Sequence, residues 1–143
     1  MSTITLKNRQ PSTAKPATPA APVTLEQKRA QFAWDFAKEG TALAGDEYRN
    51  LAKAAPALIM NNGLMQTLAF YQDKNKPQHQ ALARHLRCWI MKRAGGNGQD
   101  PGFQLMMEGL LRAEPANYRR ATDEALLILR WIRQFAAAVR SHS

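Results

Sequence analysis

The chain has 143 residues, and its 20 Lys and Arg against 11 Asp and Glu give a formal net charge of +9 at neutral pH. This length suits one domain with one hydrophobic core, and the charge favours a polyanionic partner, with nucleic acid as the leading candidate. General solubility is the alternative explanation of the charge. A single cysteine, Cys88, excludes an intrachain disulfide. No apolar run approaches the ~20 residues of a membrane span, so we expect a cytoplasmic protein with no membrane partner.

Residues 1–23 differ in composition from the rest of the chain. The segment QPSTAKPATPAAP carries four of the eight prolines and no large apolar side chain. Without such side chains a segment cannot offset its chain entropy, so we expect a flexible N-terminal tail over residues 1–23. Three basic residues in the tail could contact a polyanion or a neighbouring subunit, but the composition favours a spacer. A helical-bundle domain is then expected over residues 24–143.

The first helix has a clear start signal. Thr24 and Gln27 fit the S/T-x-x-E/Q capping box, in which two side chains satisfy backbone N–H groups at a helix start. Gly40 is the expected stop of this helix. A second helix is expected to begin near Asp46 and Glu47, because acidic residues suit the positive end of a helix dipole.

The stretch PALIMNNGLMQTLAF, residues 56–70, combines helix-like apolar periodicity with turn signals. A two-residue hairpin at Asn62 and Gly63 would need flanking strands with alternating polarity, and these are missing. We therefore interpret Pro56 as a bend or a fresh helix start. Gly63 is interpreted as a glycine tolerated inside a helix because it allows close approach of another helix.

The second half of the chain indicates three more helices. DKNKPQ breaks the chain, and Pro77 suits the first position of a helix that runs to about Arg93. AGGNGQDPG then forms a loop, and helices are expected at roughly 103–112 and 115–139. No window shows a strand pattern. The predicted fold class is all-α, a single compact bundle of about five or six helices.

Few residues suggest catalysis or metal binding. His85 and Cys88 lie three residues apart on a predicted helix, but no further cysteine or nearby carboxylate completes a zinc site. A half-buried histidine beside a small apolar cysteine is the favoured interpretation. The acidic pairs Asp46–Glu47 and Asp123–Glu124 are adjacent in sequence, and helical neighbours diverge by about 100°. Phosphate-loop, dinucleotide-binding and nucleophile-elbow motifs are missing. We expect no enzyme, cofactor or metal.

The basic residues follow helical faces. Arg84 and Arg87 lie opposite the apolar stripe of their helix, which predicts a cationic ridge that suits bidentate phosphate contacts. Charge reversal at both is expected to weaken RNA engagement without unfolding the chain. The aromatic residues lie mostly on apolar faces, so we expect phosphate contact without sequence readout. A plain solvated face is the alternative. The candidate RNA-contact residues are Arg84, Arg87, Lys92, Arg93, Arg119, Arg120, Arg130 and Arg133.

Two segments together resemble a known family. YRNLAKAAPALIMNNGLMQTLAF (48–70) resembles the signature of the small helical subunit of type III-B CRISPR effector complexes, the Cmr family. YRRATDEALLILRWIRQFAAA (118–138) is similar to the C-terminal helix of that family. Their order and spacing match the family, and the resemblance covers about residues 25–140.

The resemblance implies a non-catalytic subunit of an RNA-guided interference complex in antiviral defence. Such small subunits stack on copies of themselves in a short filament, contact other subunits, and line the channel that holds the guide–target RNA duplex with basic residues. The choice of individual arginines rests on charge and helical phase. The alternative is a free-standing helical nucleic-acid-binding protein. A small helical enzyme using Cys88, His79 or His85 is a third possibility.

Overall fold

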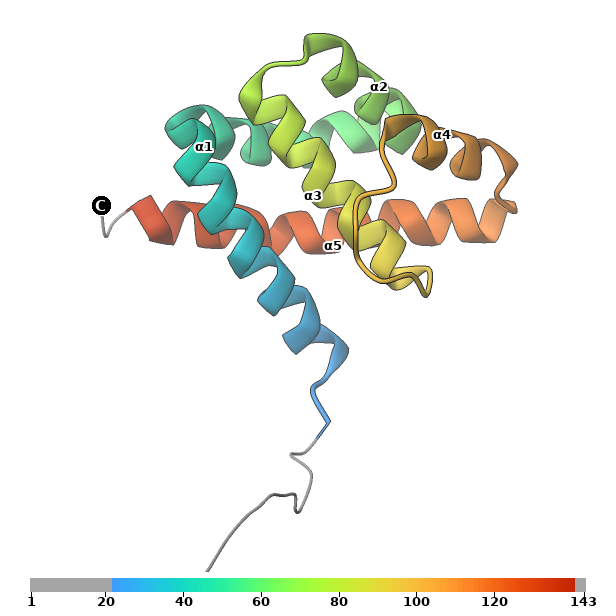
Figure 1. The fold of residues 1–143 in the computed structure, drawn as a ribbon, viewed down its shortest axis with the longest axis horizontal. Helices are drawn as coiled ribbons and strands as arrows, with labels where there is room; N and C mark the ends of the chain where they lie inside the picture. The colour runs from blue at the N-terminus through green and yellow to red at the C-terminus, as the bar shows by residue number, and fades with distance from the viewer. Residues whose placement is uncertain (1–21, 141–143) are drawn as a thin grey trace, which may run out of the picture.

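The computed structural model describes residues 22–140. Within this range the chain is all-α, with five helices and no strand, so the predicted fold class is confirmed (Figure 1). The expected tail lies outside the described residues, apart from Pro22 and Val23, which precede the first helix. The helices are α1 (Leu25–Asn62), α2 (Leu64–Lys74), α3 (Pro77–Arg93), α4 (Phe103–Arg112) and α5 (Pro115–Arg140).

The start of α1 follows the predicted capping box. The Gln27 backbone N–H donates to Thr24 Oγ1 at 3.1 Å, and the Thr24 backbone N–H donates to Gln27 Oε1 at 2.8 Å. The two bonds satisfy donors that the first helical turn leaves without partners. The start of the first helix was therefore decided by four consecutive residues.

The predicted stop at Gly40 is wrong, because α1 continues through it to a kink at Gly45. Gly45 has φ 52° and ψ −129°, a backbone conformation that favours glycine, and helical geometry resumes at Asp46, where the second helix was expected. Gly40 itself is buried against the ring of Tyr48, which occupies the space that a Cβ would need. The glycine at position 40 is therefore explained by tertiary packing against Tyr48 and not by a turn of the chain.

The interpretation of Gly63 as a glycine inside a helix is also wrong. Gly63 has φ 90° and ψ 160° and is the one residue between α1 and α2. Its N–H donates to the Ile59 carbonyl at 2.7 Å, and its carbonyl accepts from the Thr67 backbone N–H and hydroxyl at 3.1 and 2.8 Å. Pro56 lies within α1, and no new helix starts there.

The later helices match their predicted bounds closely. Pro77 is at the first helical position of α3, as expected. α1 packs most extensively against α5 and next against α3, while α4 packs on α2. Figure 1 shows the first half of α1 and the helix α3 both crossing α5, with α4 on the far side of α3 from the first half of α1. The largest buried core side chains include Tyr48, Ile59, Leu82, Leu86, Trp89, Ile128, Leu129 and Ile132.

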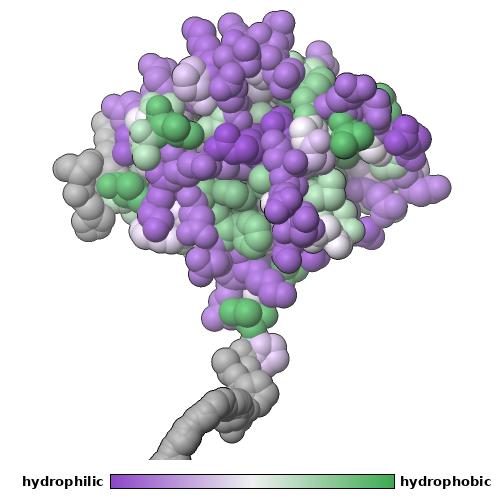
Figure 2. Space-filling view, in the orientation of Figure 1, coloured by the Kyte–Doolittle hydropathy of each residue, from purple (hydrophilic) through white to green (hydrophobic). Residues whose placement is uncertain are grey.

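One face of the molecule is mostly polar. Figure 2 shows hydrophilic residues over most of the visible face, with apolar residues in small separate patches. No helix in the range 22–140 has the length and hydrophobicity needed to cross a membrane.

Candidate nucleic-acid interface

Glu124 of α5 is the buried centre of a polar network that joins α1, α3 and α5. It is 6% exposed, and its carboxylate accepts from Arg29 Nε and Nη2 at 3.1 and 2.9 Å and from Trp89 Nε1 at 3.0 Å. Arg93 Nε lies 3.3 Å from Glu124 Oε2, an ion pair without hydrogen-bond geometry. Burial alone would raise the pKa of Glu124, but the bonds from Arg29 and Trp89 hold it below its ordinary value. The carboxylate therefore stays charged and fully engaged.

Sequence reasoning missed this role of Glu124. It treated Asp123 and Glu124 only as an adjacent acidic pair, although Glu124 lies four residues before the buried Ile128 on the same side of the helix. That position within an apolar stripe was the available signal. The partner Arg29 is 95 residues away in the sequence, and no local pattern could connect the two.

A second network is built around His85. Its Nδ1 lies 2.8 Å from the Tyr48 hydroxyl and its Nε2 lies 2.6 Å from Glu39 Oε1, which also accepts from Arg84 Nη2 at 2.6 Å. A carboxylate only accepts, so we assign the proton to Nε2, and Nδ1 then accepts from the Tyr48 hydroxyl. The ring of Phe36 stacks on the imidazole at 4.4 Å between centroids. His85 is therefore fully buried and held from both sides, more deeply than the sequence indicated.

In the described part of the chain, His85 belongs to no cluster of metal-ligating side chains. Within residues 22–140 no three His, Cys, Asp or Glu side chains are grouped so that they could hold a metal ion. Burial lowers the pKa of His85 to about 4, and this effect outweighs the neighbouring carboxylate of Glu39, which raises it. The imidazole is thus neutral at neutral pH and serves to connect α1 with α3.

Acid is expected to destabilise the fold through His85. A histidine in the unfolded chain has a pKa of about 6.5. As the pH falls from there toward about 4, the imidazole of His85 is protonated in the unfolded chain but stays neutral in the native one. Stability that is complete above about pH 6.5 should decline by up to roughly 3 kcal/mol over this window. Urea denaturation at several pH values, on wild type and His85→Phe, measures it.

Subtracting the two curves isolates His85 above about pH 5, where Glu39, whose pKa His85 itself lowers, does not yet titrate. His79, whose pKa is also lowered, first by burial and then by Lys74, is present in both proteins and cancels. Glu39, Asp100 and Glu124, with lowered pKa values, add their losses only at lower pH. Equal pH dependence of the two proteins between about pH 5 and 6.5 would contradict the assignment.

The predicted ridge of Arg84 and Arg87 is wrong for Arg87. Its side chain is buried, and its Nε and Nη2 donate to the two Asp100 oxygens at 2.8 and 3.0 Å. Asp100 lies in the glycine-rich loop after α3 and also accepts from the Gly102 N–H at 2.9 Å, so the loop covers the guanidinium. Arg84 is half-buried against Glu39. Charge reversal at Arg87 would place two carboxylates together and destabilise the loop. A loss of RNA binding in that variant would therefore not report on RNA contact by Arg87.

Three of the predicted RNA-contact residues line one groove and a hollow that adjoins it. Arg93 of α3 and Arg120 of α5 line a groove of about 350 Å³ between the end of α3 and the start of α5. Lys92 lines an adjoining hollow with Lys28 of α1, and Arg93 borders both. Among residues 22–140, the groove is lined by Ile90, Arg93, Ala94, Asn117, Arg120, Ala121 and Glu124.

The remaining three lie on the outer face of α5. Arg119, Arg130 and Arg133 are exposed, as their helical phase indicated. Arg133 also borders a shallow hollow with Lys53 of α1. Contact of these residues with RNA stays a prediction.

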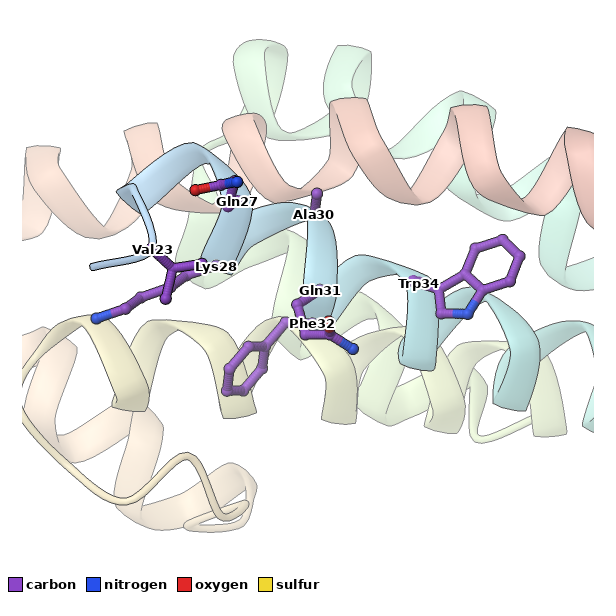
Figure 3. A pocket seen from close by; sticks show the side chains of 7 residues that line it. All are labelled: Val23, Gln27, Lys28, Ala30, Gln31, Phe32 and Trp34. Carbon is purple, nitrogen blue, oxygen red and sulfur yellow. The ribbon is translucent and has the colours of Figure 1, made fainter. Parts of the chain in front are cut away.

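A larger hollow, about 480 Å³, lies along the outside of the first half of α1. Figure 3 shows that its lining side chains, Gln27, Lys28, Phe32 and Trp34 among them, point in different directions from one helix. Lys28 is the one cation among the described residues of this lining, so the hollow does not bring the predicted basic residues together. Trp34, 38% exposed, is an aromatic residue that the sequence interpretation had not placed.

The fold and these surfaces define a small, basic helical-bundle protein. The chain belongs to the Cmr5 family of CRISPR-associated proteins, since the family model described as CRISPR-associated protein (Cas_Cmr5) matches residues 25–139. This membership confirms the resemblance to the small-subunit family of the type III-B effector.

Two relatives from Thermus thermophilus support the assignment. The protein named CRISPR system Cmr subunit Cmr5 is 32% identical over 117 residues, covering 81% of this chain and 96% of the relative. The crystal structure of a CRISPR-associated Cmr5 family protein matches with a TM-score of 0.67 at 30% identity, covering 82% of this chain and 97% of that one. The similarity therefore extends over nearly the whole of each relative.

Proposed function

We propose that this chain is a non-catalytic small subunit of a type III-B CRISPR RNA-guided interference complex. The observation that carries the proposal is the match to a Cmr subunit over 96% of that relative's length. The family model spans residues 25–139, which takes in all five described helices apart from the last residue of α5. Cutting of RNA would be done by other subunits.

Within the complex the chain stacks with copies of itself and lines the channel of the guide–target RNA duplex. The excess of basic residues supports this role, because phosphate contacts bind a duplex without selecting its sequence. The contacts are assigned to residues whose cationic groups reach the surface. These are Lys92, Arg93, Arg119, Arg120, Arg130 and Arg133. Arg87 is buried against Asp100 and serves the fold in this proposal. Arg84 is as exposed as Arg93, at 34%, but it donates a hydrogen bond to Glu39 and is also assigned to the fold.

Affinity purification tests the proposal directly. A tagged full-length chain, recovered from cells that produce it natively, is expected to bring guide RNA and partner subunits with it. Recovery of a monomer free of RNA would contradict the assignment.

The alternative, a free-standing nucleic-acid-binding protein, makes a different prediction for the isolated chain. A small subunit alone should bind RNA weakly, without sequence preference, and with strong salt dependence. Tight binding by the isolated chain at physiological salt, at about 10⁻⁸ M or below, would favour the alternative.

Charge reversal on the outer face of α5 is expected to weaken target RNA binding by the assembled complex. Arg130→Glu with Arg133→Glu removes two exposed cations, so we expect at least about a tenfold loss of affinity and a salt dependence reduced by about two ions. The matched control is Lys74→Glu with Lys76→Glu, the same charge change at the exposed turn between α2 and α3. Filter binding over a range of salt concentrations measures both. Equal losses in the two variants would mean that only net charge matters.

A further inference from the structure

We infer that the groove between the end of α3 and the start of α5 binds one phosphate of a nucleic-acid backbone, with Arg93 and Arg120 as its ligands. Glu124 acts behind Arg93 as a positioning residue. This inference rests on the proposed function and deepens it, because it selects one subsite from a broadly basic surface.

The groove has more positive charge than its own acid can neutralise. Glu124 is the single acidic residue among the described residues that line it, and Arg29 and Trp89 already occupy both carboxylate oxygens. Arg29 alone balances the charge of Glu124. Two guanidinium groups from different helices, those of Arg93 and Arg120, thus border one concave site without a second carboxylate between them.

The arrangement around Arg93 leaves its outer end available. Its side chain is 34% exposed, and Glu124 is its one charged partner in the described part of the chain. The buried Nε lies 3.3 Å from Glu124 Oε2 but makes no hydrogen bond. Because Arg29 and Trp89 hold the carboxylate in place, the carboxylate in turn restrains Arg93. A planar guanidinium held at its inner edge is suited to bidentate contact with a phosphate.

Arg120 is restrained from the opposite side of the groove. Its Nη1 donates to Asn117 Oδ1 at 2.8 Å, one turn earlier on α5, and its side chain is exposed. The volume of about 350 Å³ is near the lower end of the range for small-ligand pockets, so it suits a phosphate with its sugar. The adjoining hollow with Lys28 and Lys92 shares Arg93 and extends the positive surface beyond the groove.

Nuclear magnetic resonance on the full-length chain tests the site. Arginine Nε–H signals are followed during titration with inorganic phosphate and with a short single-stranded oligouridylate. The Arg93 and Arg120 signals are expected to shift with both probes, and the oligouridylate should displace phosphate. Arg112, exposed on α4, is the control whose signal should not move. Absence of shifts at Arg93 and Arg120 would overturn the inference, as would a phosphate shift that the oligouridylate does not displace, since that marks a free-anion site.

Affinity measurements on single-residue variants give a second test of the phosphate site. Arg93→Gln and Arg120→Gln are each expected to weaken oligouridylate binding by about five- to tenfold and to lower the salt dependence by about one ion. Arg112→Gln should change neither quantity. Losses as large in Arg112→Gln would show that net charge accounts for the effect and would overturn the inference.

The positioning role of Glu124 is tested by combining variants. Glu124→Gln keeps the shape of the side chain and removes its charge, which by electrostatics alone would strengthen oligouridylate binding. We expect binding to weaken, because Arg93 loses the ion pair that positions it. In Arg93→Gln the same change should cause little further loss, because both act through one guanidinium. Fully additive losses would contradict the role. Trp89→Phe, which removes one donor to Glu124, replaces Glu124→Gln if that variant fails to fold.

The assembled complex separates the two levels of the proposal. If the wild-type chain brings down no guide RNA or partner subunits, the proposed function fails. If it assembles normally, and Arg93→Gln with Arg120→Gln engages target RNA as well as wild type, only the phosphate site is overturned.

Discussion

Trp89→Ala is expected to lower the free energy of unfolding by about 3–5 kcal/mol, the largest loss of any change considered. Trp89 is 1% exposed, and its ring packs against Phe32 at 5.1 Å between centroids. Removing it leaves a cavity between α1, α3 and α5 and takes one hydrogen-bond donor from the buried Glu124. Small domains are stable by only about 5–15 kcal/mol, so the variant should approach the limit of folding.

Urea denaturation followed by circular dichroism measures the effect, with Trp34→Ala as the control. Trp34 contacts Phe135 and Lys38 at the surface, so its removal should cost about 1 kcal/mol or less. Trp89→Phe keeps most of the aromatic volume but not the N–H, and should lie between the two, at about 1–2 kcal/mol for the lost hydrogen bond. Similar losses in Trp89→Ala and Trp34→Ala would contradict the central place of Trp89 in the core.

Gly40→Ala is expected to destabilise the protein by about 2–3 kcal/mol, although alanine is normally the better helix former. The added methyl group would meet the ring of Tyr48. That ring is fully buried, and its hydroxyl is held by His85 Nδ1 at 2.8 Å, so it cannot move aside without breaking the bond. Overpacking should therefore exceed the gain in helix propensity.

Gly109→Ala in α4 is the matched control. There an added Cβ meets nothing within 4 Å, and the substitution should stabilise the protein by up to about 1 kcal/mol. Thermal unfolding of both variants gives opposite shifts if the interpretation is right. A neutral or stabilising effect of Gly40→Ala would mean that the Tyr48 ring can shift to make room for the methyl group. The close approach of ring and backbone would then not be required for stability.

Glycines were the least predictable residues of the fold. At Gly40 the sequence indicated a helix stop, and at Gly63 it indicated a helix interior, and each assignment was the reverse of what the structure shows. The two cases differ in physical cause, because Gly63 is required by a positive φ of 90° and Gly40 by a neighbouring ring. Composition and periodicity around a glycine do not separate these causes.

For the candidate interface, the basic residues show the same limit of prediction from local sequence patterns. Helical phase correctly placed Arg119, Arg130 and Arg133 on an outer face, because exposure along a regular helix follows from its period alone. It placed Arg87 equally outside, but Asp100 returns from a loop to cover it. The course of a glycine-rich loop depends on contacts that no periodicity encodes.

Local and short-range information in the sequence thus determined the all-α class, most helix ends and the family. Capping at Thr24, Pro77 at a helix start, and apolar stripes with period 3.6 act within a few residues and survive in the sequence as patterns. Only the tertiary structure decided which basic side chains are paired with carboxylates and which are exposed without such a partner. It brought Arg29 to Glu124 across 95 positions and placed Arg93 and Arg120 on one groove, because burial and ion pairing depend on neighbours distant in the chain.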